Sequence, residues 1–285
     1  MEIKHSIDQE VFYDREHALT RGIYFKNYSI EIHDHTYHEI NIILSGSGIH
    51  TVESQTFAAE AGDVFVIPPG VRHGYKSQSN DFHVFHIIIK NRFFDKCESE
   101  LSKFLGFMVL FEIEPFLRAQ NRKTFLHLDP ESLNYLKKVL YAYQELQKEE
   151  LDETDILSSA EVFKIIGYLS IKMANRTFSA ETKGDYDSIA ITQVIAYIHA
   201  NCSEKITIDV LAKRCNMSRA TFIRKFKKVT NTTPNAYITS YRIRLAHRML
   251  DLGKSKTVIA HECGFYDVSH MDKVLTGKRS RQPSL

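Results

Sequence analysis

Three histidines and a glutamate fall within nine residues of the sequence, in the stretch IHDHTYHEI at 32–40. Imidazole nitrogens and carboxylate oxygens bind divalent transition metals, and the same groups form hydrogen bonds with polar small molecules. His33 and His35 are two residues apart, so on a strand they would share one face, whereas His38 and Glu39 would point to opposite faces. The stretch is therefore compatible with a metal site, with a ligand site, or with a polar strand that has neither duty.

The segment that must position these side chains, residues 20 to 95, has the pattern of short β-strands. Runs rich in β-branched and aromatic residues occur at 40–44, 64–67 and 82–89, and turn signals separate them at 45–48, 61–63 and 68–70. Strands at this spacing are typical of a sandwich or a small barrel.

After Arg92 the pattern becomes helical. Leu133, Leu136, Leu140 and Tyr143 form one apolar stripe in a helix expected over 131–150. A second helix is expected over 155–176, with Ile156, Phe163, Ile166, Leu169 and Met173 as its apolar positions. Such stripes indicate either packing within the domain or a helix–helix contact between two chains.

Charge divides the chain into two parts. From Ser188 onward there are 17 lysine and arginine residues against 6 acidic ones, whereas 1–187 contain 20 against 29. The polar, glycine-containing segment 178–187 separates the parts and reads as a linker. A basic part beside an acidic one indicates that only the C-terminal part meets a polyanion.

Targeting and redox features are few. The charged N-terminus lacks the apolar run of a secretory signal, and no 18-residue apolar stretch suggests a membrane span. The four cysteines form no CxxC pair, so we expect reduced, buried thiols. We expect a cytoplasmic protein without a membrane partner.

The segment ITIDVLAKRCNMSRATFIRKFKKVT at 206–230 has the pattern of a helix-turn-helix motif. Residues 207–209 can cap a first helix that carries Val210, Leu211 and Ala212 inward, and Asn216 can adopt the left-handed conformation of a tight turn. Ser218 then caps a second helix with an apolar inner face and a basic outer face.

A second copy of this pattern occurs in TVIAHECGFYDVSHMDKVL at 257–275. Ala260 and Gly264 repeat Ala212 and Asn216 at an offset of 48, whereas Met271 repeats Phe222 at an offset of 49, so the second turn is one residue longer. The segment 234–250 reads as one helix between the copies. Two recognition helices on one rigid helix can enter successive major-groove segments of a duplex.

These residues resemble the AraC/XylS family of transcriptional regulators over about the last 95 residues. The matching positions are Thr207, Leu211, Ala212, Ser218, Phe222, Phe226, Lys227, Pro234, Tyr237, Ile238, Arg242, Ala246, Leu250, Ile259, Ala260, Gly264, Phe265, Asp267 and Ser269. The resemblance implies a DNA-binding domain with two helix-turn-helix motifs.

The family's docking mode gives the expected DNA contacts. Base-facing positions would be Ala220, Thr221, Ile223 and Arg224 in the first recognition helix, and Val268, Ser269, His270, Asp272 and Lys273 in the second. Arg224 can donate two hydrogen bonds to guanine. The rest of the expected interface comprises Ser218, Arg219 and Lys225, together with Lys227 and Lys228 as phosphate contacts.

The C-terminal end departs from the family pattern. Val274-Leu275 runs directly into TGKRSRQPSL, where the family continues its second recognition helix and adds a supporting helix. We therefore expect the second half-site contact to be weak or absent.

The N-terminal histidines resemble a second pattern, the two motif blocks of the cupin fold. His33, His35, Glu39 and Gly46 follow the first block, and Gly62, Pro68, Gly70 and His73 the second, while Ser77 and Asn27 depart from it. In cupins with this motif, the three histidines and the glutamate surround one divalent metal. The resemblance therefore implies His33, His35, Glu39 and His73 as candidate ligands.

Three interpretations of these four residues stay open. They line an effector pocket with no required cofactor, they bind a divalent metal, or they are structural polar residues. A metal-dependent cupin enzyme fused to a DNA-binding module is the alternative function. Short stretches at 38–50 and 110–115 resemble sugar-operon regulators of the family, especially rhamnose-type ones, which favours a carbohydrate effector.

The predicted architecture is a two-domain α+β protein. It has a cupin-like effector-sensing β-barrel at 1–95, a helical segment for dimerisation at 96–178, a linker at 179–188 and an all-α double helix-turn-helix domain at 189–285. The expected function is a non-enzymatic, effector-responsive regulator that binds promoter DNA, acts with RNA polymerase and forms a homodimer. Effector, operator and direction of regulation do not follow from the sequence.

Overall fold

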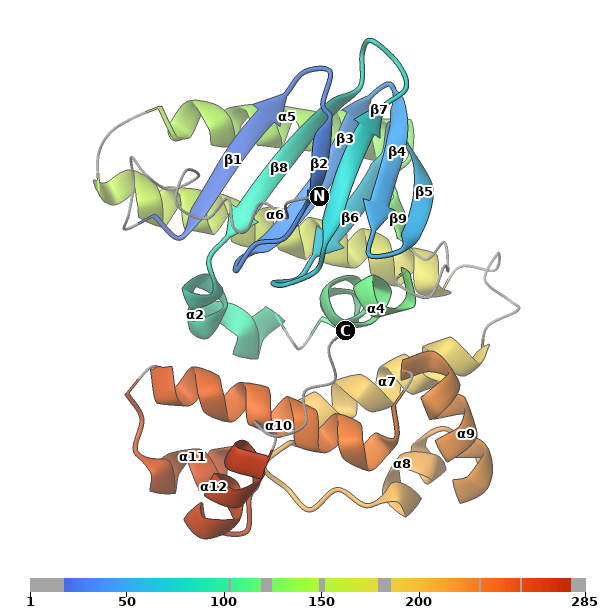
Figure 1. The fold of residues 1–285 in the computed structure, drawn as a ribbon, viewed down its shortest axis with the longest axis vertical. Helices are drawn as coiled ribbons and strands as arrows, with labels where there is room; N and C mark the ends of the chain where they lie inside the picture. Colours follow the sequence, from blue (N-terminus) through green and yellow to red (C-terminus); the bar gives the residue numbers. More distant parts are fainter. Residues whose placement is uncertain are drawn as a thin grey trace. The chain divides into compact units, whose positions relative to one another are not determined.

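The structure is a computed structural model that describes residues 18–101, 104–118, 125–148, 152–178, 186–230, 232–251 and 253–277. The chain forms two compact units, 1–182 and 183–285 (Figure 1). Their boundary falls within the expected linker 179–188. Of that segment, 179–185 lie outside the described residues, and the remainder begins helix α7 (Tyr186–Ala200).

The N-terminal unit contains two antiparallel sheets. The five-stranded sheet has the order β1 (Thr20–Phe25), β8 (His83–Ile89), β3 (His38–Ser45), β6 (Asp63–Ile67) and β9 (Leu126–His127). The four-stranded sheet has the order β2 (Ile30–His33), β7 (His73–Ser77), β4 (Ser47–Val52) and β5 (Gln55–Glu60). The three strand runs read from the sequence correspond to β3, β6 and β8.

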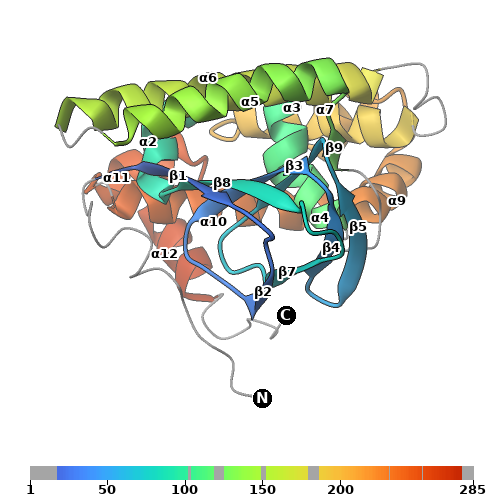
Figure 2. The same ribbon diagram turned by 90° about the horizontal axis from the view of Figure 1, so that it is seen from above.

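The two sheets face one another as a sandwich (Figure 2), so the cupin-like α+β layout is confirmed, although the described strands do not close into a barrel. Among the described strands, backbone pairing ends at β1 and β9 in one sheet and at β2 and β5 in the other. The inner faces are instead held together by buried side chains such as Ile43, Phe65 and Tyr75. The chain crosses between the sheets at Gly46, whose φ of +71° suits glycine.

Helices α5 (Pro130–Leu146) and α6 (Asp152–Phe178) pack beside β1 of the five-stranded sheet (Figure 2). Asp129 caps α5 by accepting a hydrogen bond from the Ser132 amide at 2.8 Å. The predicted stripe of α5 is confirmed, since all four of its residues are buried. Tyr143 lies directly over Gly22 of β1, where a Cβ would come within 2.5 Å of the ring.

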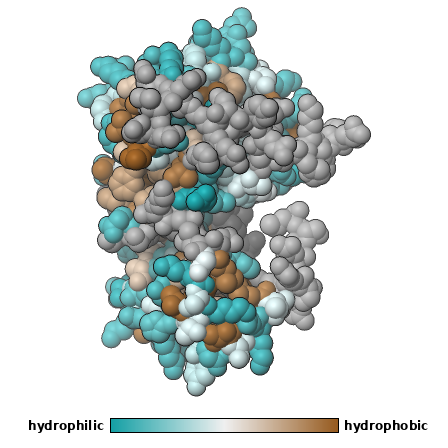
Figure 3. Space-filling view, turned by 90° about the vertical axis from the view of Figure 1, so that its left-hand side faces the viewer, coloured by the Kyte–Doolittle hydropathy of each residue, from teal (hydrophilic) through white to brown (hydrophobic). Residues whose placement is uncertain are grey.

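The predicted apolar stripe of α6 is only partly correct. Ile166, Leu169 and Met173 are buried, but Ile156 is 73% exposed and Phe163 36%. Both line a surface pocket together with Leu19 and Phe93. A space-filling view shows hydrophobic side chains gathered at one edge of this unit (Figure 3).

A short helical segment connects the sheets to these helices. It comprises α2 (Asn91–Leu101), α3 (Leu105–Met108), the π-helix η1 (Val109–Ile113) and α4 (Glu114–Arg118). Gly106 permits the close approach of α3 to α6, because a Cβ there would collide with the Ser170 backbone. The π-helical turn then leads into α4, which carries Glu114 and Arg118 into the interior, both fully buried.

The C-terminal unit is helical, as predicted. After α7 come α8 (Ile208–Arg214), α9 (Arg219–Thr230), α10 (Pro234–Asp251), α11 (Lys256–Glu262) and α12 (Val268–Gly277). No helix among the described residues is both long enough and apolar enough to cross a membrane.

The two helix pairs α8–α9 and α11–α12 are built alike. Thr207 and Ser255 cap their first helices, and Ser218 and Asp267 accept hydrogen bonds from the first turn of their second helices. The intervening turns are 215–218 and 263–267, so the second is one residue longer, as expected.

Two details of the first pair can be compared with the sequence. The predicted left-handed conformation of Asn216 is confirmed by its φ of 50°, and Gly264 at the equivalent position has a φ of 69°. Val210 was expected to face inward but is 42% exposed. The buried positions of α8 are instead Ile208, Leu211 and Ala212, which the helical spacing of three and four residues brings together.

Candidate functional sites: a buried histidine cluster and two helix-turn-helix motifs

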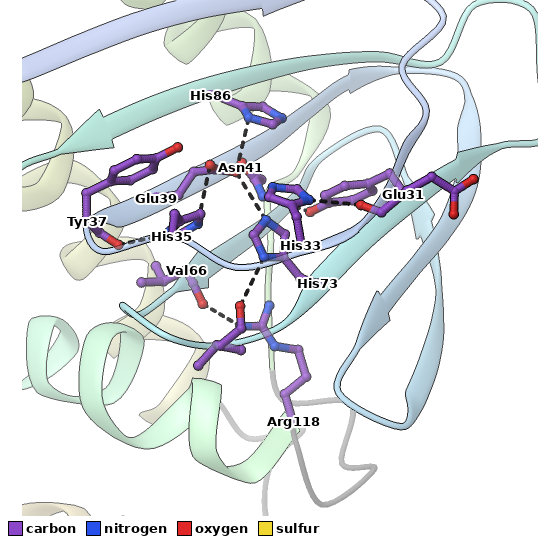
Figure 4. Close-up of polar contacts among 12 residues, drawn as sticks. Glu31, His33, His35, Tyr37, Glu39, Asn41, Val66, His73, His86 and Arg118 are labelled. Carbon is purple, nitrogen blue, oxygen red and sulfur yellow. Dashed lines mark hydrogen bonds and ion pairs between the residues drawn. The ribbon is translucent and has the colours of Figure 1, made fainter. Parts of the chain in front are cut away.

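Glu39 is the centre of a buried cluster of histidines between the two sheets (Figure 4). Its Oε2 atom lies 3.5 Å from Nε2 of His35, and its Oε1 atom lies 3.6 Å from Nε2 of His73. Nδ1 of His86 lies 3.0 Å from the same Oε1 atom. Strands β3 and β8 of one sheet and β7 of the other therefore contribute to one cluster.

Strand register explains why these residues meet. Glu39 and Asn41 share one face of β3, and His86 of β8 lies directly opposite Asn41. On the other sheet, His33 pairs with His73. Because the sheets stack face to face, their inward side chains converge.

The histidines are oriented by backbone carbonyls. Nδ1 of His33 lies 2.9 Å from the Glu31 oxygen, that of His35 2.8 Å from the Tyr37 oxygen, and that of His73 3.2 Å from the Val71 oxygen. A carbonyl oxygen only accepts, so each neutral ring carries its proton on Nδ1 and keeps a lone pair on Nε2. Backbone acceptors orient metal-binding histidines in this way in proteins generally.

The Nε2 atoms of His35 and His73 therefore direct lone pairs at a carboxylate that also only accepts. Neither nitrogen has a hydrogen-bond partner among the described residues, although both are buried. Such an arrangement is stabilised by a cation between the groups. With metal–ligand bonds of about 2.1 Å, neighbouring ligand atoms lie about 3.0 to 3.4 Å apart, close to the distances here.

Burial and neighbouring charge set the ionisation of the cluster. Burial, together with His73 and His33, lowers the pKa of His35 to about 4, so this ring is neutral at neutral pH. Burial alone would raise the pKa of Glu39, but His86 and His73 hold it well below its usual value. His35 is thus a neutral imidazole and Glu39 an ionised carboxylate, the forms in which these two groups bind metal.

The structure brings together three of the four predicted ligands, His35, Glu39 and His73, as a group able to hold a metal ion. The His33 ring lies beside them, with its centroid 4.4 Å from that of His73, but its nitrogens are outside the group. The prediction that His33 and His35 share one face of a strand is wrong for His35, because β2 ends at His33. His38 was correctly left out, since it contacts Asn91 and Phe94 instead.

Sequence reasoning missed the remaining polar groups of the interior. His50 stacks on Tyr75 with ring centroids 4.2 Å apart, and His86 contacts Glu39. A sequence signal existed only for His86, which interrupts the otherwise apolar run 84–89, because the strand that carries His50 also contains serine, glycine and threonine. No comparable signal marked Arg118, since its burial depends on the π-helical turn.

In the first helix-turn-helix motif, α9 separates a buried face from an exposed face. Phe222, Phe226 and Val229 are buried. The expected base-facing residues Ala220 and Arg224 are exposed. The remaining expected DNA contacts of this motif are half-buried or exposed: Ser218, Arg219, Thr221, Ile223, Lys225, Lys227 and Lys228.

Among the expected contacts of this motif, Arg219 and Thr221 both have partners in the chain. Arg219 lies 3.5 Å from the Asp209 carboxylate, a solvent-exposed pair that costs little to break. The hydroxyl of Thr221 accepts a hydrogen bond from Ser218 at 2.9 Å. Arg224 extends from the middle of the exposed face.

In the second motif, α12 presents Ser269, His270 and Lys273 to solvent. Val268 is half-buried against the core of this motif. Asp272 forms an ion pair with Lys256 at 2.9 Å, so its carboxylate is already partnered. The C-terminal residues 278–285, on which the expectation of a weak second half-site rests, lie outside the described residues.

A buried polar cluster in a sandwich and a pair of helix-turn-helix motifs together define a ligand-binding transcription regulator. Comparison with known families agrees. Residues 22–165 match the AraC-like ligand binding domain, and residues 211–283 match a helix-turn-helix domain. The chain belongs to the AraC family of transcription regulators.

Named relatives are distant. The chain is 24% identical over 259 residues to the HTH-type transcriptional activator RhaS of Pectobacterium carotovorum, covering 88% of this chain and 85% of that protein. It is 24% identical over 271 residues to RhaS of Escherichia fergusonii, covering 93% and 90%.

Solved structures with partial similarity include ToxT from Vibrio cholerae, at 14% identity over 93% of this chain and 96% of that one, with a TM-score of 0.34. The DNA-binding domain of AdpA in complex with a target DNA is 27% identical over 31% of this chain and 81% of that one, with a TM-score of 0.30.

Proposed function

We propose that this regulator responds to a small molecule bound between its two sheets, and that binding changes its affinity for a promoter sequence. The observation that supports this most directly is the Glu39 cluster, in which buried polar atoms have no hydrogen-bond partner among the described residues. Buried polar atoms are nearly always hydrogen-bonded, so an interior of this kind suits a polar ligand. The similarity to RhaS favours control of a carbohydrate-utilisation operon and an activating role.

The test uses duplexes selected by the full chain from a random library. Affinity is measured by fluorescence anisotropy with and without a set of sugars and sugar acids. We expect at least one compound to change promoter affinity for the wild-type chain. Glu39→Gln should lose this response, whereas His38→Gln, on the adjacent outward-facing residue, should keep it. A chain whose DNA affinity no compound alters would contradict the proposal.

The same cluster is proposed to hold one divalent metal through His35, Glu39 and His73, with His33 beside them. Three imidazoles and one carboxylate suit several transition metals about equally. Elemental analysis of the dialysed full chain should give about one equivalent of metal. His73→Gln should lose it and His38→Gln should retain it; equal metal content in both variants would argue against the site.

The alternative is a metal-dependent cupin enzyme with an attached DNA-binding module. A metal bound by His35, Glu39 and His73 could act as a Lewis acid, and this chemistry is what favours the alternative. Turnover that needs His73 and is indifferent to Arg224→Ala would support the enzyme. Promoter binding that is lost in Arg224→Ala supports the regulator.

We also propose that the chain forms a homodimer and acts with RNA polymerase in the cytoplasm. Exposed apolar side chains on α5 and α6 support a contact between two copies. These side chains are Tyr135, Tyr141, Ile156, Leu157, Phe163 and Ile171. Sedimentation of Ile156→Lys and Leu157→Lys against wild type tests the contact. We expect the variants to be monomeric at concentrations at which the wild type is dimeric.

A further inference from the structure

The Arg118 side chain is a second polar feature of the N-terminal interior. It is fully buried, its Nη2 donates to the Val66 carbonyl, and its Cζ lies 5.3 Å from the centre of the Phe65 ring. Its Nε is 3.5 Å from a carboxylate oxygen of Glu114. Among the described residues, Nε and Nη1 find no hydrogen-bond partner, and neither do the two Glu114 oxygens.

A continuous set of side chains connects Arg118 to the Glu39 cluster. The Phe65 ring under the guanidinium is 4.4 Å from the His50 ring, and the His50 ring is 6.3 Å from that of His73. Both ring nitrogens of His50 are buried without a partner among the described residues. In Figure 4 the Arg118 guanidinium lies on the His73 side of the cluster.

Charge then restricts what can enter this interior. With a divalent metal in the cluster, the metal and Arg118 contribute three positive charges. Glu39 and Glu114 contribute at most two negative charges, so at least one positive charge is uncompensated, and any protonated histidine would add to it. Arg176, which lies near Glu114, and Asp63, which lies near Arg176, carry opposite charges and therefore offset each other in this count. Buried charge without a counter-ion is costly, so an anion is favoured when the metal is present.

We infer that the metal-loaded domain binds a small hydroxycarboxylate, whose carboxylate pairs with Arg118 and whose other oxygens reach the metal. This inference rests on the proposed metal site. It deepens the proposed function by naming the chemical class of the effector. A planar guanidinium matches a carboxylate, and Nε and Nη1 of Arg118 make no hydrogen bond among the described residues, although Nε lies 3.5 Å from Glu114. A neutral sugar of the same carbon skeleton satisfies the hydrogen bonds but leaves the positive charge uncompensated.

The experiment compares acid and neutral partners on the full chain. Zinc-loaded protein, dialysed free of excess zinc, and metal-free protein are titrated by calorimetry with glycerate against glycerol, gluconate against sorbitol, and galacturonate against galactose. We expect at least one acid to bind zinc-loaded protein at least about tenfold more tightly than its neutral partner. The preference should disappear in metal-free protein. If no acid in the set shows a tenfold preference, the inference is overturned.

Variants of the buried pair provide the second arm. Arg118→Gln combined with Glu114→Gln removes both charges together and should abolish the preference for the acid while leaving zinc content unchanged. Arg118→Lys keeps the charge and should retain part of the preference. Circular dichroism verifies folding. A double variant that still prefers the acid tenfold overturns the role of Arg118.

Zinc content, measured in the same samples before and after titration, separates the possible failures. Protein that binds no zinc refutes the metal site, and the inference fails with it. Protein that binds zinc but treats acid and neutral partners alike refutes the inference only, and indicates that hydroxide on the metal or solvent balances the charge. Promoter affinity, measured by anisotropy on the same protein, reports separately on the proposed regulator.

Discussion

The Oε1 atom of Glu39 lies 3.6 Å from Nε2 of His73, although the two residues belong to different sheets. Both atoms are buried, and the histidine nitrogen has no hydrogen-bond partner among the described residues. A ligand bound between them would connect the five-stranded sheet to the four-stranded sheet. Occupancy of the cluster would therefore change how firmly the sheets are held together.

The first prediction follows from that connection. Zinc at about 100 times its dissociation constant should stabilise the wild-type chain by about 2.7 kcal/mol, because it binds the folded state. The thermal unfolding midpoint should rise accordingly for wild type and for His38→Gln. His73→Ala should show no zinc-dependent rise. An equal rise in all three proteins would mean that zinc acts elsewhere on the chain.

The second prediction separates specificity from affinity in α9. Arg224→Ala should weaken binding to the selected duplex by about 1–3 kcal/mol and reduce discrimination between duplexes, because a base contact is lost. Lys228→Ala should weaken binding to selected and random duplexes alike and reduce the salt dependence, because a phosphate contact is lost. Anisotropy titrations at several salt concentrations measure both effects. Identical behaviour of the two variants would refute the assignment.

The third prediction compares the equivalent turn positions Asn216 and Gly264, which both have positive φ. A Cβ at Gly264 would lie 2.2 Å from the Cys202 carbonyl oxygen, so Gly264→Ala should destabilise the second motif by about 2 kcal/mol or more. Asn216→Gly should change stability by less than about 1 kcal/mol, because glycine adopts this conformation freely. Urea denaturation measures both changes; a mild effect of Gly264→Ala would show that the turn rearranges.

The fourth prediction concerns Glu114. Burial raises the pKa of this carboxyl to about 7, while Arg118 and Arg176 oppose the rise. The folded chain then holds a proton that the unfolded chain releases between about pH 4.5 and pH 7, so this group's contribution to stability falls as pH rises through that window. The loss amounts to about 3 kcal/mol.

Glu114→Gln should remove that dependence. The free energy of unfolding of wild type relative to this variant should decrease between pH 4.5 and pH 7 and level off above pH 7. Urea denaturation at several pH values gives the difference. A difference that is constant with pH would show that Glu114 is already ionised at the lower end of the window.

The repeated motifs could be read from sequence because their signals are local. Caps such as Ser218, the left-handed Asn216 and the inward phenylalanines depend on neighbours a few residues away. The same holds for the stripe on α5. The prediction of inward positions was wrong for Val210, which the helical spacing of the buried α8 residues leaves exposed, and for Ile156, whose exposure depends on the packing of distant elements.

The candidate site was only partly readable for the same reason. His33, His35, Glu39 and His73 could be selected because their spacing matches the cupin motif blocks. His86 and His50 enter the site through strand pairing, which the sequence does not state. Arg118 enters the interior through a π-helical turn that has no sequence signal. Which strands lie at the edges of the two sheets likewise depends on long-range strand pairing.

The central claim is that ligand binding between the sheets controls recognition of a particular DNA sequence. It is tested most directly by selecting duplexes from a random library with the full chain. The affinity of the enriched sequence is then measured against random duplex at physiological salt, with and without the ligand found by titration. The account predicts a clear preference for the enriched sequence that the ligand changes in wild type but not in Glu39→Gln. Equal affinity for enriched and random duplexes, or a ligand effect that persists in Glu39→Gln, would contradict it.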